Sequence, residues 1–346
     1  MTTSNTIQTR RLRTHFVESG PEDGVPVVLV HGNLSTGRFY EHLFDGAPER
    51  YRLIAPDMRC FGDSEALPID ATRGLADWAD DTQALIEALG IERPVHLAGW
   101  STGGAAIAAF ALDRAVASLT FIDPVSPYGY GGTHADGTPC FPDWAGTGGA
   151  AGAPEFVARL AAGDRSGEGA ASPRNVLTSA YWSPNHQEDP ERVEMLLTEV
   201  LKSVTGDDGY PGDSTASEHW PGFAPGTRGI LNALSGKHCN WTEIASLDPK
   251  PPILWTHGSE DIVVADGSPW EVGTLGELGA IPDWPGTEAF PPQPMVWQIR
   301  SVLQRYRDAG GRAEMEMFEG SGHFPPIDAA ERWSALFFAF LDSAES

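Results

Sequence analysis

The segment that most restricts the fold is residues 95–112, where a strand-like run, a glycine-flanked serine and an alanine-rich run follow one another. Residues 95–98 predict a strand, and residues 105–112 predict a helix of small side chains. Between them, residues 99–103 have the pattern G-x-S-x-G, centred on Ser101. Glycines two residues to either side let the backbone turn sharply and leave the serine oxygen exposed. The segment therefore predicts a strand–turn–helix unit with Ser101 at the turn.

The alternation of strand and helix continues through both ends of the chain. Apolar runs bounded by turn residues, which are typical of strands buried on both faces, occur at residues 26–30, 51–56, 118–122 and 252–256. Residues 313–318 alternate as a last strand. Apolar side chains are spaced at helical intervals in residues 75–89, 295–306 and 329–341. Strands that alternate with helices predict an α/β fold with a mainly parallel sheet.

This rhythm is interrupted between residues 125 and 250. That stretch is rich in Gly, Ser, Pro, Trp and Tyr and contains only isolated helical patches, at residues 154–160 and 190–204. It is too long for a plain loop. We therefore interpret residues 125–250 as an inserted cap on a core domain formed by residues 1–124 and 251–346. A second excursion, residues 267–294, is dense in Gly, Pro and Trp.

Charge and composition exclude several classes of protein. The chain has 23 basic and 48 acidic residues, a net charge of −25. Such a surface repels phosphate backbones and anionic lipid headgroups, so we expect no binding to nucleic acid or membrane surfaces. Because the N-terminal residues show no apolar leader segment and no long apolar run occurs, we expect a cytoplasmic protein.

The cysteines Cys60, Cys140 and Cys239 form an odd and sparse set, which does not indicate a disulfide framework. A Cys140–Cys239 bridge is the alternative, and the rarity of cytosolic disulfides disfavours it. The histidines of the inserted stretch lack the spacing of metal ligands: His134, His186, His219 and His238. We therefore expect no metal and no cofactor.

A reactive serine needs a base, and the base needs an acid that orients it. His323 follows the last predicted strand, late in the chain, and lies between Gly322 and Phe324. Asp261 follows the strand that ends at residue 256, which gives the order Ser…Asp…His. Asp123, after an earlier strand, and Glu260 are the alternatives for the acid.

Two backbone N–H groups are needed to stabilise the oxyanion that forms during acyl transfer. Thr102, directly after the serine, is expected to supply one of them. The turn after the first apolar strand, residues 31–34, is expected to supply the other. Within that turn we favour Asn33, with Leu34 as the next choice.

Together these motifs resemble those of the α/β-hydrolase superfamily. The matching segments are residues 31–33 (H-G-N), 57–64, 99–103, 257–261 and 322–323. The resemblance covers residues 15–124 and 250–342 but not the cap. It implies a mostly parallel sheet of about eight strands with helices on both faces, and a ligand site at the carboxyl ends of the strands.

The chain also departs from the family in places. Cys60 stands where the family often has glycine, and residues 31–35 are not the H-G-G-P-G turn of its proline-specific peptidases. Haloalkane dehalogenases and epoxide hydrolases of the family use an aspartate where this chain has Ser101, which excludes their chemistry.

The resemblance implies a serine hydrolase that cleaves a carboxylic ester or lactone through an acyl-enzyme. Aromatic residues are frequent in the cap and predict a bulky or aromatic small-molecule substrate, although they could equally form the core of the cap. The expected substrate contacts are Leu34, Trp100, Trp182 and Trp220. The alternatives are an amidase or C–C bond hydrolase on the same triad, and a non-hydrolytic lyase or binder that retains the fold.

Overall fold

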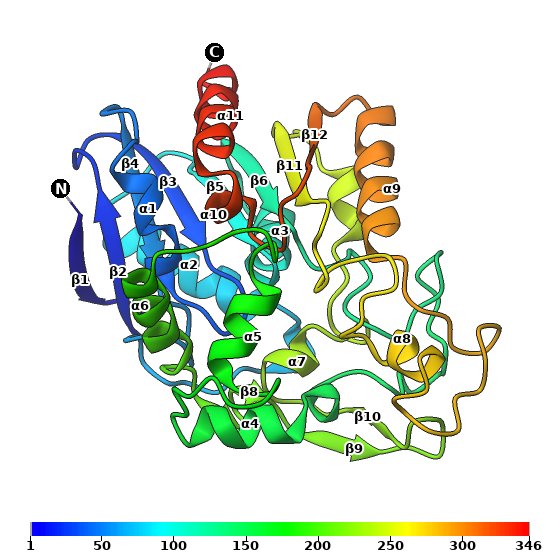
Figure 1. The fold of residues 1–346 in the computed structure, drawn as a ribbon. Coiled ribbons are helices and arrows are strands. Elements are labelled where there is room, and N and C mark those ends of the chain that lie inside the picture. Colours follow the sequence, from blue (N-terminus) through cyan, green and yellow to red (C-terminus); the bar gives the residue numbers. More distant parts are fainter. Residues whose placement is uncertain (1, 346) are drawn as a thin grey trace.

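The computed structural model describes residues 2–345, which form an eight-stranded sheet covered by helices on both faces (Figure 1). The strand order is β1-β2-β4-β3-β5-β6-β11-β12. The bounds are β1 Thr3–Gln8, β2 Arg13–Ser19, β3 Val25–Val30, β4 Tyr51–Pro56, β5 His96–Trp100, β6 Ser118–Ile122, β11 Ile253–Gly258 and β12 Ala313–Phe318. From β4 to β12 neighbouring strands are parallel, whereas β1 and β2 pair antiparallel at one edge. The predicted fold class is confirmed.

Helices flank the sheet as the sequence pattern predicts. On one face lie α2 and α3, and the other is covered by α1, α10 and α11 (Figure 1). The bounds of the core helices are α1 Glu41–Phe44, α2 Ala76–Ala88, α3 Thr102–Asp113, α9 Met295–Asp308, α10 Pro325–Asp328 and α11 Ala330–Ala344. The sequence pattern missed β1 and β2, because both are polar at alternate positions or at their ends and contain no continuous apolar run.

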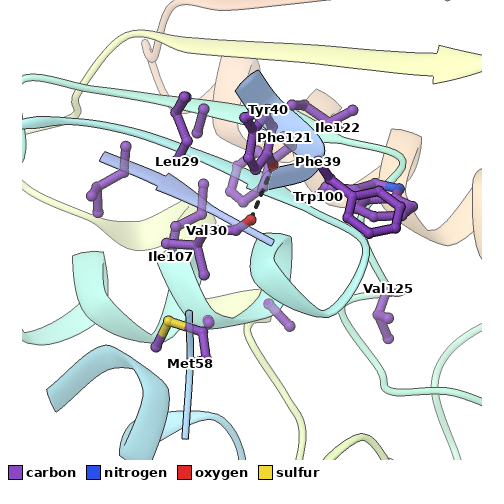
Figure 2. Packing of buried hydrophobic residues seen from close by; sticks show 14 of the residues in the cluster. Leu29, Val30, Phe39, Tyr40, Met58, Trp100, Ile107, Phe121, Ile122 and Val125 are labelled. Atoms are coloured by element: carbon purple, nitrogen blue, oxygen red, sulfur yellow. Dashed lines mark hydrogen bonds between the residues drawn. The ribbon is translucent and has the colours of Figure 1, made fainter. Parts of the chain in front are cut away.

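A cluster of buried rings fixes the strand ends that carry the predicted site. Trp100 and Phe39 are fully buried with their ring centroids 5.7 Å apart, and Tyr40 donates a hydrogen bond of 3.1 Å to the carbonyl of Val30 (Figure 2). Phe39 and Tyr40 both belong to the short 3-10 helix η1 Gly37–Tyr40. The ends of β3 and β5 therefore lie in a closely packed interior, which holds their backbone in place.

The chain between β6 and β11 adds a layer of short elements beyond the carboxyl ends of the strands (Figure 1). Its helices are α4 Pro154–Ala161, α5 Pro173–Ala180, α6 Pro190–Val200, α7 Ile230–Ala233 and the 3-10 helix η4 Thr242–Ser246. Its strands are β7 Thr205–Gly206, β8 Tyr210–Pro211, β9 Ser214–Ala216 and β10 Phe223–Pro225. The predicted helical patch at 190–204 ends at Val200, and α5 was not predicted.

Two side-chain contacts attach this inserted segment to the loop after β3. The buried carboxylate of Glu199 on α6 accepts a hydrogen bond of 3.0 Å from the Thr36 hydroxyl. The Tyr181 hydroxyl donates to the carbonyls of Asn33 and Leu34, at 3.1 Å each. The segment is therefore attached directly to the turn in which the sequence predicts an oxyanion-stabilising N–H.

Cys60, Cys140 and Cys239 are free thiols, so the alternative of a Cys140–Cys239 bridge is not formed in this structure. Within residues 2–345, no helix combines the length and the apolar character that crossing a bilayer requires.

A buried ion cluster attaches the loop after β4 to α2. The guanidinium of Arg59 contacts Asp81 through two hydrogen bonds, of 2.6 and 2.7 Å, and lies 3.1 Å from Asp77. Arg11 contacts the same two carboxylates, at 2.6 and 3.0 Å. Both carboxylates are buried, so their charges depend on arginines for compensation, and Arg73 adds a further contact of 2.6 Å to Asp77.

We expect Arg59→Met to lower the free energy of unfolding by about 3 kcal/mol, the lower end of the range for removing one partner of a buried ion pair, because Arg11 still faces both carboxylates. Urea denaturation measures this change. Arg10→Met is the matched control, since Arg10 and its partner Glu87 are 61 % and 46 % exposed. Its effect should stay below about 1 kcal/mol. Equal effects in the two variants would contradict this account of the cluster.

Candidate active site

Ser101 lies at a sharp turn between β5 and α3 with φ 53° and ψ −114°, a conformation that is strained for a residue with a side chain. The two flanking glycines make this turn possible. A Cβ at Gly99 would lie 2.3 Å from the carbonyl oxygen of Gly103, and one at Gly103 would lie 2.2 Å from that of Val30. Any larger residue at either position would displace the backbone that presents Ser101.

The imidazole of His323 is oriented by Asp261. These residues follow β12 and β11, and His323 Nδ1 lies 2.8 Å from Asp261 Oδ2. Asp261 Oδ1 also accepts hydrogen bonds from the backbone N–H groups of Val263 (2.7 Å) and Val264 (3.1 Å). Burial alone would raise the pKa of Asp261, but the facing His323 and its hydrogen bond hold that pKa below the usual value. Asp261 is therefore a carboxylate at neutral pH.

Trp100, the residue before Ser101, also anchors His323. Trp100 Nε1 donates a hydrogen bond of 2.7 Å to the backbone carbonyl of His323, and the two rings are 5.5 Å apart. Ser101 and His323 line the same cavity. The structure thus brings Ser101, His323 and Asp261 together from the ends of three strands.

The two alternative acids have other partners. Asp123 is fully buried, and its Oδ1 accepts a hydrogen bond of 2.8 Å from the N–H of Gly258. Burial and then the nearby charge of Asp261 raise the pKa of Asp123 well above the usual value, which favours its neutral form. Glu260 accepts a hydrogen bond of 2.6 Å from the hydroxyl of Ser183. Of the three acids, Asp261 is the one hydrogen-bonded to His323.

The turn at residues 31–34 lies against the nucleophile. A Cβ at Gly32 would lie 3.0 Å from the Trp100 ring and 3.2 Å from Ser101 Cβ. In the described part of the chain, the backbone N–H groups of Asn33, Leu34 and Thr102 have no hydrogen-bond acceptor. These groups are therefore available to an oxyanion formed at Ser101, and Asn33 and Leu34 both remain candidates for the second donor.

His31 holds this turn in place. Its Nδ1 donates to the carbonyl of Gly32 at 2.7 Å, and its Nε2 accepts the N–H of Met58 at 2.9 Å, which ties the turn to the loop after β4. Burial lowers the pKa of His31 to about 4. The ring is therefore neutral at pH 7, which the bond accepted at Nε2 requires.

A largely apolar cavity of about 420 Å3 opens at Ser101. Leu34 and Trp100 line it, as the sequence analysis predicted. The far walls come from the inserted segment and from the excursion at residues 267–294, of which Trp270 is part. Among the described residues of the lining, none is Asp, Glu, Lys or Arg. A largely apolar site without charged groups favours an uncharged, hydrophobic ligand.

The other two predicted substrate contacts lie elsewhere. Among the described residues that line the cavity, neither Trp182 nor Trp220 occurs. Trp182 is buried behind the histidine loop, where a Cβ at Gly322 would lie 2.5 Å from its backbone carbonyl carbon. The Trp220 indole donates 2.8 Å to the carbonyl of Pro282 and packs against Phe290. Both rings serve packing between segments.

The aromatic rings that do form the cavity wall include Tyr130, Phe156, Tyr181, Tyr210 and Trp270. The sequence shows that aromatic residues are abundant in this segment, but it does not distinguish the rings that line the cavity from those that pack elsewhere. No periodic pattern marks the cavity side of such short, irregular elements.

The eight-stranded sheet and a serine on a strained strand-to-helix turn define the α/β-hydrolase class. Comparison of the sequence agrees: residues 27–336 match the Alpha/beta hydrolase family, and the chain belongs to this family. The resemblance on which the sequence analysis relied is confirmed.

Individual relatives match over shorter segments. A protein named "Uncharacterized carboxylesterase nap" of Bacillus subtilis (strain 168) is 32 % identical over 152 residues, which are 40 % of this chain and 49 % of that protein. Carboxylesterase YbfK of the same organism is 33 % identical over 107 residues, 31 % and 35 % of the two chains. The cis-3-alkyl-4-alkyloxetan-2-one decarboxylase of Xanthomonas campestris pv. campestris is 38 % identical over 96 residues, 26 % and 32 %. The chain thus spans between a third and a half of these relatives' length.

Solved structures resemble the chain over its whole length. A putative aryl esterase from Burkholderia cenocepacia and the esterase RhEst1 from Rhodococcus sp. ECU1013 each have a TM-score of 0.60 and 17 % sequence identity, and each match covers 99 % of both chains. At this identity the likeness shows the fold.

The neutral state of His31 predicts a loss of stability in mild acid. Its folded pKa of about 4 lies below the ordinary value of 6.5, so the unfolded chain takes up the proton first as the pH falls. This residue should therefore lower the free energy of unfolding by about 2–3 kcal/mol between pH 7 and pH 4.5. Denaturant unfolding of the wild type and of His31→Gln at both pH values measures the effect. The wild type should lose more stability than the variant, and an identical loss in both would contradict the assignment.

Proposed function

We propose that this protein is a serine hydrolase that cleaves a carboxylic ester or lactone through an acyl-enzyme. The observation that carries the proposal is the joint placement of two groups. Ser101, on its strained turn, and His323, hydrogen-bonded to the ionised Asp261, line one cavity. We also propose that residues 1–124 and 251–346 are a catalytic core and that residues 125–250 are a cap that shapes the substrate site.

In the proposed reaction, Ser101 Oγ attacks the carbonyl carbon of the ester while His323 Nε2 takes the serine proton. Asp261 accepts the Nδ1–H of His323, which fixes the tautomer and stabilises the imidazolium that forms. The N–H groups of Thr102 and of Asn33 or Leu34 stabilise the oxyanion. His323 then protonates the leaving alcohol, and a water molecule activated by the same histidine releases the acid.

The cavity lining supports a neutral ester over a charged substrate, because no Lys or Arg among the described lining residues could balance a substrate carboxylate. The names of the two Bacillus subtilis relatives support ester hydrolysis, whereas the name of the Xanthomonas relative, a decarboxylase, supports the lyase alternative. A cytoplasmic location stays a prediction from the sequence.

Ser101→Ala tests the nucleophile. We expect hydrolysis of 4-nitrophenyl butyrate to fall by more than about a thousandfold, because only the oxyanion donors and the cavity remain. The variant should keep its circular dichroism spectrum and lose labelling by a fluorophosphonate. Ser214→Ala, on the exposed strand β9, is the control and should keep both turnover and labelling. Turnover of Ser101→Ala within tenfold of the wild type would refute the proposal.

Asp261→Asn and Asp123→Asn test the acid. The first should lower kcat on the order of 10³–10⁴-fold, because an amide favours the wrong tautomer of His323. The second should cost far less, since the raised pKa of Asp123 favours its neutral form and an asparagine oxygen can still accept the N–H of Gly258. Steady-state kinetics on the same ester separates the two. The reverse order of effects would assign the acid to Asp123.

A further inference from the structure

The cavity wall contains three tyrosines, and two of their hydroxyls are already engaged. Tyr181 donates to the carbonyls of Asn33 and Leu34. Tyr130 donates to the carbonyl of Val263 at 2.9 Å. These two hydroxyls therefore hold the walls of the site together and have no proton left to offer a substrate.

The third hydroxyl, that of Tyr210, has no hydrogen-bond partner among the described residues, although the residue is only 6 % exposed. Its backbone is fixed in β8, where its N–H donates 2.9 Å to the carbonyl of Val204. Its ring packs edge-on against Phe156, with the centroids 5.9 Å apart. A phenol held this firmly in an apolar wall loses free energy unless something satisfies its O–H.

Tyr210 lines the same cavity as the proposed catalytic residues. Tyr210 and Phe156 belong to the inserted segment, whereas Ser101 and His323 belong to the sheet, and all four residues line the same cavity. Tyr210 therefore meets the cavity from a part of the chain other than the one that carries Ser101 and His323.

We propose that the Tyr210 hydroxyl binds an uncharged oxygen of the substrate other than that of the scissile carbonyl, whose oxyanion the backbone N–H groups stabilise. The substrate class is then a neutral, mostly apolar ester or lactone that carries a second oxygen function, such as a ketone, an ether or a second ester carbonyl. This inference rests on the function proposed above. The absence of charged groups among the described lining residues excludes a carboxylate or ammonium group at that position.

The ratio of kcat/KM for a keto ester to that for its alkyl parent tests the inference. The probes are 4-nitrophenyl heptanoate and its 5-oxo and 6-oxo analogues, which have nearly the same length and shape. Tyr210→Phe keeps the ring and removes only the hydroxyl. We expect it to lower the ratio by about 2- to 12-fold for at least one keto ester, the usual effect of one neutral hydrogen bond.

Tyr130→Phe is the matched control, because its hydroxyl is engaged with the backbone of Val263, and it should leave the ratio unchanged. An unchanged ratio in Tyr210→Phe, as expected if only water satisfies the hydroxyl, would overturn the assignment. Equal decreases in both variants would overturn it too, because the effect would then not belong to Tyr210. If the wild type hydrolysed none of the three esters, the proposed function itself would fail, and this inference with it.

Discussion

The strained backbone at Ser101 is the constraint on which the site depends. A residue with positive φ outside glycine costs on the order of 1–3 kcal/mol and persists only where its surroundings hold it. Here the end of β6 does so: Ser101 N–H donates 2.9 Å to the carbonyl of Ile122, and Ser101 C=O accepts the N–H groups of Gly104 (3.0 Å) and Val125 (3.2 Å). The same packing brings Gly32 against Ser101 Cβ, so the turn proposed to supply an oxyanion donor and the proposed nucleophile are positioned together.

The parallel sheet also brings two carboxyl groups to one place. β6 and β11 are neighbours, so Asp123 and Asp261, which follow them, are buried side by side with His257 between the two loops. Two buried carboxyl groups this close cannot both be ionised without a large cost. The hydrogen bond from His323 stabilises the charge on Asp261, whereas the raised pKa of Asp123 favours its neutral form. The electrostatics of the pair therefore select which acid can orient the histidine.

In the proposed function, substrate recognition and catalysis belong to different parts of the chain. The reacting groups stand on the strand ends of the core, whereas the opposite walls come from the inserted segment and from residues 267–294. Contacts such as Tyr181 to the oxyanion turn and Glu199 to Thr36 hold the two parts together. Changes in the inserted segment can therefore alter the cavity while the triad geometry is preserved.

The alternation of strands and helices and the placement of Ser101, Asp261 and His323 at strand ends are predictable from the sequence, because these depend on local periodicity and on glycine at fixed spacing. The sequence could not reveal the polar edge strands β1 and β2, whose pairing is non-local. It also placed Trp182 and Trp220 at the substrate, whereas the cavity is lined by Tyr210, Phe156 and Trp270. Which face of a ring meets a cavity depends on packing between segments far apart in the chain. Those segments come together only in the folded chain. The tertiary structure is therefore needed to recognise that Asp261 carries the charge and that the Tyr210 hydroxyl has no partner among the described residues.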